Sequence, residues 1–411
     1  MRSLTTLAAG LALSILAPTA SAVVAYSGGT LSGVINDDVT VGGGFNTVTI
    51  DGAQVAGTIT FSAALNSGAT VIIKDTTATG GSGINFASLT NNVVTMTNVV
   101  IASAAAASGL SFGPMVGSTV SITGGSATSP AHAALHFPGA IDAASSVTVK
   151  DLAATSSGTV GPVNFATTVA GALSFTGCHL QSKASTGSSV LAFPGVLTGP
   201  LTVTDTTLTG SVYNGLSLVS IRSAVTLTNV VATAATNGQA LYVIAMAGGT
   251  LTVSGGTFNG AANGMKIGPM DSASAFSVTD AAVLSTTANP IRFGTVAGPV
   301  TIAGCSATTA TTASISAMWL ELAVTAPLRV ADSTFASGYG GIIVADLQAA
   351  LSLWNVAAAG AAAAGLQVSA MAGASVAVSG GSFASAAAAA MSLPAMDSVS
   401  SVSMNGITAT S

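Results

Sequence analysis

The sequence predicts a right-handed parallel β-helix of about fifteen coils. One short phrase recurs fifteen times between Gly52 and Gly406: two apolar residues alternate with two outward residues, and Gly, Asp or Asn follows. Successive phrases lie 23 to 28 residues apart. Strict alternation is typical of a β-strand, and a fixed period of this size indicates a solenoid.

Each phrase is expected to form one strand of a coil. Both apolar positions are filled in every copy, from Val48 and Ile50 to Val402 and Met404. Stacked coils would pair these strands in parallel and bury apolar side chains that a single coil cannot bury. A left-handed helix would need hexapeptide phasing, which the sequence lacks. The residues that close the phrases are Gly52, Asp75, Asn98, Gly124, Asp151, Gly177, Asp205, Asn229, Gly255, Asp280, Gly304, Asp332, Asn355, Gly380 and Gly406.

A second strand is expected in most coils, before the next phrase. Its sign is an alternating apolar pair, such as Ile84 with Phe86 or Leu135 with Phe137. Only 7 to 10 residues separate this pair from the next phrase, which predicts a short corner. The stretch between a closing residue and the second strand is rich in Ala, Ser, Thr and Gly, and we expect a looser return there.

A longer repeat lies over the coils. Residues 110–128 resemble residues 241–258 and 366–383, and the closing residues recur every 125 to 131 positions, five coils apart. This pattern indicates growth by copying of five-coil blocks. It predicts one continuous β-helix over residues 45–411, preceded by an N-terminal cap region over residues 23–44.

The N-terminus resembles a secretory signal peptide over residues 1–22. Arg2 supplies a positive charge, Leu4 to Leu16 form the apolar run, and Ala20-Ser21-Ala22 match a cleavage site. Cleavage after Ala22 would make the protein secreted or displayed at the cell surface; an uncleaved anchor or an expression artefact is the alternative. The apolar run is too short to span a membrane, and no second run of 18 apolar residues exists.

Composition limits the partners. Charged residues make up 5% of the chain, against about 25% in ordinary domains. The net charge of −5 and the lack of a basic cluster argue against nucleic acid. Cys178 and Cys305 occupy equivalent positions five coils apart, so at about 4.8 Å per coil they are too far apart for a disulfide. We expect two buried thiols, with intermolecular pairing as the alternative.

No catalytic, cofactor-binding or metal-ligating residue is predicted. Asp75, Asp151, Asp205, Asp280 and Asp332 close phrases, where Asp exchanges with Gly and Asn as turn residues do. Asp37 and Asp38, the one acidic pair, lie in the cap region, and His132, His136 and His179 occupy unrelated positions. The alternative is a polysaccharide-active β-helix enzyme, either a lyase or a glycoside hydrolase. It would need carboxylates and basic residues to converge on neighbouring coils.

Hydroxyl side chains dominate the outward positions. The position between the two apolar residues is Ser or Thr in twelve of the fifteen phrases, and the next outward position is Ser or Thr in eight. Thr is favoured in strands for packing reasons alone, but aligned hydroxyls would also form a recognition face for glycans or ice. The candidate surface-binding residues are Thr95, Thr97, Thr202, Thr204, Thr226, Thr228 and Thr252.

Two segments carry a resemblance to a known family. Residues 227–243 (LTNVVATAATNGQALYV) and 248–270 (GGTLTVSGGTFNGAANGMKIGPM) resemble the dispersed-gene-family surface proteins of trypanosomes, and the resemblance covers roughly residues 90–411. It implies a pectin-lyase-like β-helical ectodomain with an adhesive role. Those proteins are longer and end in membrane helices, which this sequence lacks, and no catalytic residue carries over. The expected function is a secreted or cell-surface structural or adhesion-type solenoid without catalysis, with host-cell or matrix glycans or proteins as partners.

Overall fold

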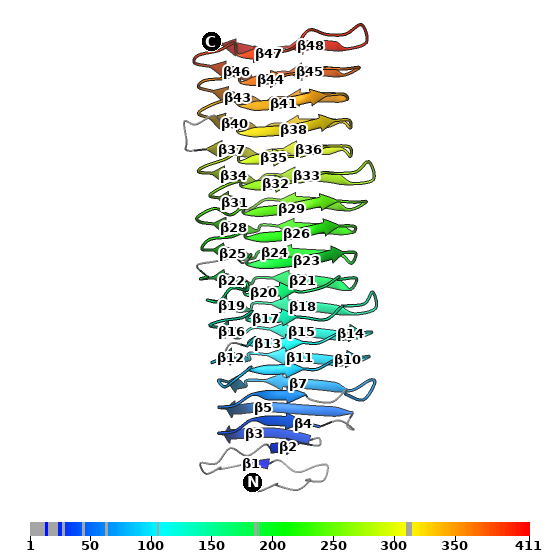
Figure 1. The fold of residues 1–411 in the computed structure, drawn as a ribbon, viewed down its shortest axis with the longest axis vertical. Coiled ribbons are helices and arrows are strands. Elements are labelled where there is room, and N and C mark those ends of the chain that lie inside the picture. The colour runs from blue at the N-terminus through cyan, green and yellow to red at the C-terminus, as the bar shows by residue number, and fades with distance from the viewer. Residues whose placement is uncertain are drawn as a thin grey trace. The chain divides into compact units, whose positions relative to one another are not determined.

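The computed structural model describes residues 13–14, 24–26, 29–42, 46–61, 65–104, 107–184, 187, 189–309 and 315–411. The chain divides into two compact units, Met1–Ser211 and Val212–Ser411. Within each unit the strands of successive coils lie one above another and pair in parallel (Figure 1). The described residues contain strands and no helix. The predicted all-β parallel solenoid is confirmed for both units.

The N-terminal segments predicted from the sequence are described only in part. Residues 1–22 lie outside the described residues except for β1 (Leu13–Ser14), which pairs with β3 (Gly29–Ile35). In the cap region, β2 (Val24–Tyr26) pairs with β4 (Val39–Val41). β3 and β4 also pair in parallel with strands of the next coil, so the stacking includes residues before 45.

Each coil of the first unit carries three strands in succession, and strands at equivalent positions form three rows. β3 and β5 (Thr47–Val55) run through the corner and serve both the first and the second row. The other first-row strands are β7 (Thr70–Lys74), β11 (Val93–Thr97), β15 (Thr119–Thr123), β18 (Ser146–Lys150), β21 (Ala172–Thr176) and β24 (Leu201–Thr204). The second row contains β8 (Thr77–Ala78), β12 (Val100–Ala102), β16 (Ser126–Ser129), β19 (Ala153–Ser156), β22 (His179–Ser182) and β25 (Thr207–Gly210). The third row contains β2, β4, β6 (Ile59–Phe61), β9 (Ile84–Phe86), β13 (Leu110–Phe112), β17 (Leu135–Phe137), β20 (Val163–Phe165) and β23 (Leu191–Leu197). A short extra pair joins β10 (Leu89–Thr90) to β14 (Met115–Val116).

The second unit repeats the three rows. Its first row contains β27 (Ala224–Thr228), β30 (Thr250–Ser254), β33 (Ala275–Thr279), β36 (Val300–Ala303), β39 (Leu328–Ala331), β42 (Ala350–Trp354), β45 (Ser375–Ser379) and β48 (Ser401–Asn405). The second row contains β28 (Val231–Ala234), β31 (Thr257–Gly260), β34 (Ala282–Ser285), β37 (Ser306–Thr309), β40 (Thr334–Ser337), β43 (Ala357–Gly360), β46 (Ser382–Ser385) and β49 (Thr408–Thr410). The third row contains β26 (Leu216–Ile221), β29 (Leu241–Met246), β32 (Met265–Ile267), β35 (Ile291–Phe293), β38 (Met318–Val324), β41 (Ile342–Leu347), β44 (Leu366–Val368) and β47 (Met391–Ser392).

The second-row strands correct the expectation of a loose return. β16 pairs with β19 over four residues, and its inward positions hold buried Ala127 and Ser129. In the four-residue second-row strands the second inward residue is Ser, Thr, Gly or Ala, whereas the first ranges from Ala127 to Leu180 and Phe258. One large inward residue per strand carries little of the hydrophobic alternation by which a strand is recognised. The backbone there is nonetheless paired in parallel from coil to coil, as the first and third rows are.

The corner between the first and second rows has a left-handed backbone in every coil. All fifteen closing residues have a positive φ, from 48° at Asp75 to 70° at Gly380. Gly adopts this conformation freely, and Asn and Asp are the residues that tolerate it best. The turn role predicted for the corner aspartates is therefore confirmed.

The order of residues along the column of corners follows from their contacts. Asn98 Nδ2 donates to Asp75 Oδ1 at 3.2 Å, and Asn355 Nδ2 donates to Asp332 Oδ1 at 2.9 Å. Where Gly follows Asp, a side chain would displace the carboxylate: a Cβ at Gly177 would lie 2.3 Å from Asp151 Oδ1. Along the chain the corners read Gly, Asp, Asn, Gly, Asp three times, with Gly406 in the last place. An Asp corner is thus followed by an amide donor or by glycine.

A column of phenylalanines fills the core of the first unit on the third row. Neighbouring rings are 4.3 to 5.2 Å apart between centroids and lie within 14° of parallel. Offset stacking of this kind adds to the gain from burial. It also holds each third-row strand in register with the next. The stacked residues are Phe61, Phe86, Phe112, Phe137, Phe165 and Phe193.

Two glycine substitutions test the corner packing. Gly177→Ala and Gly52→Ala both place a side chain at a φ near 64°, since the two values are 65° and 63°. That conformation alone costs about 1–2 kcal/mol. A Cβ at Gly52 meets no atom within 4 Å, whereas one at Gly177 would lie 2.3 Å from Asp151 Oδ1 and displace that carboxylate. We expect Gly177→Ala to lower the free energy of unfolding by more than Gly52→Ala in chemical denaturation, and equal losses would refute the packing argument.

Candidate functional site

The structure aligns the predicted Ser and Thr residues into rows on the first-row strands. We call the row between the two apolar positions the first hydroxyl row. Within each unit, every member of the row is the register partner of the member in the next coil. The members are Thr95, Ser121, Thr148, Ser174 and Thr202 in the first unit, and Thr226, Thr252, Ser277 and Thr301 in the second.

The second hydroxyl row lies beside the corner. It aligns Thr97 with Thr123 and Thr176 with Thr204 in the first unit, where Lys150 interrupts it. In the second unit it aligns Thr228, Ser254 and Thr279, and Thr279 Oγ1 donates to Ser254 Oγ at 3.5 Å. The side chains of both rows are exposed or half-buried. A hydroxyl both donates and accepts, so two parallel rows offer many weak contacts to one extended ligand.

An exposed tryptophan belongs to the same face and was missed by the sequence analysis. Trp354 continues the second hydroxyl row of the second unit, in register between Ala331 and Ser379, and 66% of its surface is exposed. A large apolar ring left open on a polar surface often marks a binding site. The missed signal was a Trp at a position that holds Ser or Thr in eight coils.

The remaining acids form local structure. Asp142, Asp271 and Asp397 recur 129 and 126 residues apart, and each accepts a hydrogen bond from a glycine amide of the preceding coil. The hydroxyls of Ser145 and Ser274 donate to the first two at 2.6 and 2.7 Å. The hydrogen bond from the serine hydroxyl has the largest effect, and together with the backbone bonds it holds the pKa of both carboxyls below its usual range. Among the described residues no three His, Cys, Asp or Glu side chains are grouped to hold a metal.

The cysteines are buried thiols, as expected. Cys178 lies on the first unit and Cys305 on the second, directly after a corner glycine in each case. The Sγ atoms lie 3.5 Å from the carbonyl oxygen of Thr176 and 3.2 Å from that of Ala303, respectively. Burial raises the pKa of both thiols, so they are poor nucleophiles.

Two histidines that were judged unrelated come together. Ser108 Oγ lies 3.1 Å from His132 Nδ1 and 3.2 Å from His136 Nδ1, whereas His179 is exposed on β22 outside this group. Burial, and then the charge of His132, lower the pKa of His136 to about 4. The sequence carries no sign of this pairing, because His132 lies in a loop and His136 on strand β17. Both side chains nevertheless face Ser108 of the previous coil.

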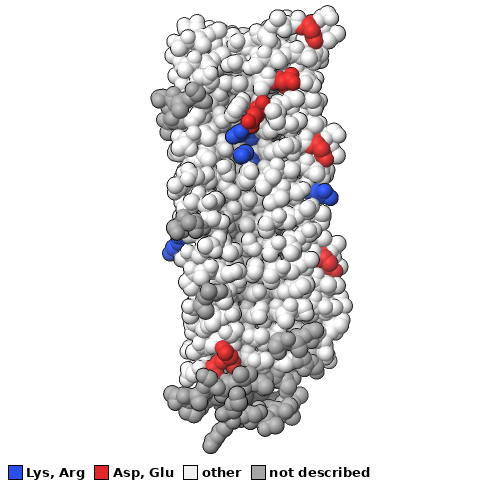
Figure 2. Space-filling model, in the orientation of Figure 1, with Lys and Arg blue, Asp and Glu red and all other residues white. Residues whose placement is uncertain are grey.

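A basic and aromatic cluster lies on the third row of the second unit. Tyr242, Lys266, Arg292 and Trp319 are outward residues of β29, β32, β35 and β38 and are successive register partners. Lys266 Nζ lies 5.0 Å from the centroid of the Tyr242 ring, and Arg292 Cζ lies 5.1 Å from that of Trp319. Both distances allow cation–π attraction. Figure 2 shows basic and acidic groups side by side on an otherwise largely uncharged face.

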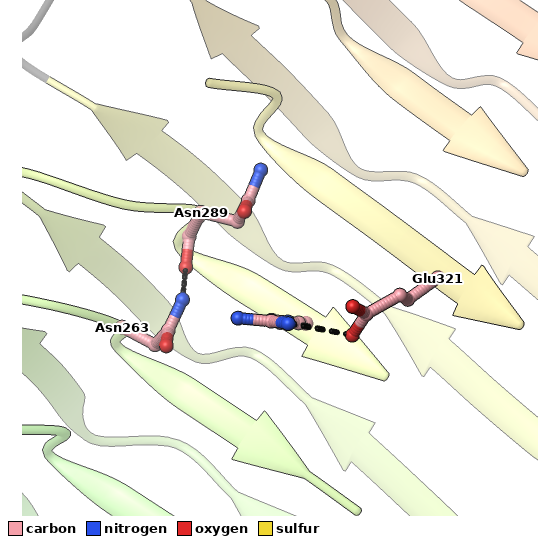
Figure 3. A network of polar contacts seen from close by, with 4 residues as sticks. Asn263, Asn289 and Glu321 are labelled. Carbon is pink, nitrogen blue, oxygen red and sulfur yellow. Dashed lines mark hydrogen bonds and ion pairs between the residues drawn. The ribbon is translucent and has the colours of Figure 1, made fainter. Parts of the chain in front are cut away.

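Glu321 completes this cluster, and two glycines line it. Glu321 Oε2 accepts from Arg292 Nη2 at 2.6 Å and from Nε at 3.0 Å; in Figure 3 the carboxylate faces the guanidinium. Gly268 and Gly294 follow the inward residues of β32 and β35, and a Cβ at Gly268 would lie 1.9 Å from the carbonyl oxygen of Ile244, so glycine lets the backbone of the two coils approach closely there. These residues line a groove of about 260 Å³, which we call the basic groove.

Buried amides support the strands beneath the basic groove. Asn263 Nδ2 donates to the carbonyl oxygen of Asn289 at 2.7 Å (Figure 3). Asn289 Nδ2 donates in turn to the carbonyl oxygen of Ser316 at 3.0 Å. Buried hydrogen bonds of this kind are expensive to break. They fix the starts of β32 and β35, which carry Lys266 and Arg292. The sequence analysis missed the groove because it aligned the apolar residues of the second strand and not the outward residue between them.

Comparison with known proteins shows no family for this chain. No protein-family model and no curated relative matches the chain. Among solved structures, the chain is similar to the A-module of the mannuronan C-5 epimerase AlgE6 of Azotobacter vinelandii, with 11% identity and a TM-score of 0.32. The similarity covers 92% of this chain and 91% of that chain. Among the described residues, none forms a helix long and apolar enough to cross a membrane.

The histidine pair predicts a pH dependence of stability. The folded pKa of His136 is about 4, below the value of about 6.5 in an unfolded chain. As the pH falls from 6.5 to 4, the unfolded chain therefore takes up a proton that the folded chain refuses, and stability is lost. We expect His136→Asn, an exchange that the neighbouring coil already makes at Asn164, to reduce the loss in unfolding free energy between pH 7 and pH 5. His179→Asn is the matched control, and an unchanged loss in His136→Asn would contradict the assignment.

Proposed function

We propose that this protein is a secreted or cell-surface adhesion-type β-solenoid that binds glycans along its hydroxyl rows without catalysing a reaction. The observation that carries the proposal is the register of the first hydroxyl row. In the first unit five consecutive coils place a Ser or Thr side chain over the equivalent one below it. The partners would be host-cell or matrix glycans, with proteins of the same surfaces as the alternative class.

The rows suit a long neutral ligand. Strand stacking repeats a hydroxyl about every 4.8 Å, and each hydrogen bond to it contributes little by itself. Contacts that are added along one chain raise the overall affinity because later contacts are intramolecular. Trp354 adds an apolar ring, against which the carbon face of a sugar can stack.

Two sequence features support the location and role. The signal-like segment ending at Ala22 favours export, and the resemblance to trypanosome surface proteins favours adhesion. The alternative, a polysaccharide-active enzyme, would require a carboxylate free to act as an acid or base. The corner aspartates serve the turns, and Glu321 is tied to Arg292 by two hydrogen bonds. Catalysis therefore forms no part of the proposal.

Removal of the row hydroxyls tests the proposal. In the variant Thr202→Val, Thr226→Val, Thr252→Val the side chains keep their shape and strand preference but lose three hydroxyls. Since each lost bond is worth about 0.5–1.5 kcal/mol, we expect at least about tenfold weaker binding to the neutral glycans that the native chain captures on a printed array. Trp354→Ala should weaken the same binding severalfold.

The control places the same substitution outside the rows. Thr209→Val and Thr233→Val alter outward residues of the second-row strands β25 and β28 and should leave binding unchanged. If native and row-variant chains bind neutral glycans equally, the rows have no recognition role. Release of cleaved or unsaturated products from a bound glycan would overturn the non-catalytic part of the proposal.

A further inference from the structure

We propose that the basic groove of the second unit binds the sulfate group of a sulfated glycan. The site consists of Tyr242, Lys266, Arg292 and Glu321, on the third row of strands. The hydroxyl rows lie on the first row, so this inference does not rest on the function proposed above.

The charges of the groove call for an anion. Lys266 and Arg292 carry two positive charges and Glu321 carries one negative charge, which leaves a net charge of +1. Among the described contacts the Lys266 ammonium has a cation–π contact with Tyr242 and no ion pair. Burial, and then repulsion by Arg292, lower the pKa of Lys266. Glu321 opposes these two effects only in part. A bound anion beside Lys266 would favour its charged form further, so the groove is suited to a negative group.

The geometry favours sulfate over carboxylate. Glu321 already accepts from Nε and from one N–H of Nη2 of Arg292. The donors left for a ligand are the Lys266 ammonium and the Nη1/Nη2 edge of the guanidinium, which come from two different coils, so a planar carboxylate could pair with that edge but would leave the ammonium out of its plane. Donors that approach from separate directions suit an oxyanion whose free oxygens are not coplanar, as in a sulfate ester.

The walls of the groove favour a sugar over a free ion. Tyr242 lines the groove beside the ammonium, and the apolar side chains of Ile244 and Leu322 are exposed along it. Trp319, outside the groove, holds the guanidinium by its cation–π contact. The groove of about 260 Å³ falls just below the range of about 300–1,000 Å³ for drug-sized ligands. It therefore accommodates one sugar ring with its sulfate. Because the aromatic rings and Glu321 already hold both cations, little conformational freedom is lost on binding.

Heparin titration tests the inference on the full chain. We expect heparin to bind, chemically desulfated heparin, which keeps its carboxylates, to bind at least about tenfold more weakly, and inorganic sulfate to compete only at far higher concentration. Lys266→Met keeps the length of the side chain but removes its charge, and should weaken heparin binding about tenfold, the loss of one charge-assisted contact of about 1.4 kcal/mol. Glu321→Gln removes the competing negative charge and should strengthen binding severalfold.

Lys150→Met is the matched control, since Lys150 is an outward lysine of the first unit outside the basic groove. It should leave heparin binding unchanged, and urea midpoints should show that all three variants are folded. Equal losses in Lys266→Met and Lys150→Met would indicate diffuse charge attraction and overturn the site. Equal binding of desulfated heparin would overturn the sulfate assignment, and inorganic sulfate that binds as tightly as heparin would overturn the glycan assignment. Neutral-glycan binding by the hydroxyl rows should be the same in Lys266→Met, which separates the two proposals.

Discussion

The left-handed corner at the end of every first-row strand is the constraint on which the rest of the structure depends. Fifteen residues hold a positive φ there, and all are Gly, Asp or Asn. The corner turns the chain at the same point in each coil, so that every strand beyond it meets its equivalent in the next coil. Stacking adds a second condition, because the side chain of one corner reaches over the next. An Asp such as Asp75 is followed by a donating Asn98, and Asp151 is followed by Gly177.

Fixed register is also what gives the surface its chemistry. A chain with 5% charged residues cannot rely on steering by charge, but fixed register places each outward residue over the equivalent position of the next coil. The same geometry that aligns Thr226 with Thr252 places Lys266 beneath Arg292. On the first-row strands the outcome is a repetitive face of hydroxyls with few charges. On the third-row strands of the second unit it is a single compact cluster. We infer two modes of recognition, one distributed and one local, from one repeating backbone.

The sequence allowed the fold and the hydroxyl rows to be predicted, because both follow from a period. Inward Val, Leu and Ile on the first-row strands and Phe on the third-row strands make the apolar alternation clear. The coil period then predicts that outward residues such as Thr95 and Thr202 lie in one row, as they do. The second row was missed because only one of its two inward positions carries large apolar residues, such as Phe258, while the other is small. The basic groove and the pairing of His132 with His136 could not be found in this way. Both features depend on contacts between unlike residues that occur once. A repeat pattern in the sequence predicts only the features that recur in every coil.

The stability of two variants of Asn98 tests the corner account most directly. Asn98→Gly removes the amide that donates to Asp75 and leaves a residue suited to a positive φ. Asn98→Asp also suits that φ but places two carboxylates together without a donor. In urea unfolding at pH 7 and low salt, the account predicts that Asn98→Asp is less stable than Asn98→Gly by about 1 kcal/mol, and that 1 M salt narrows the gap by screening. An Asn98→Asp variant as stable as Asn98→Gly would show that corner order is not governed by these contacts.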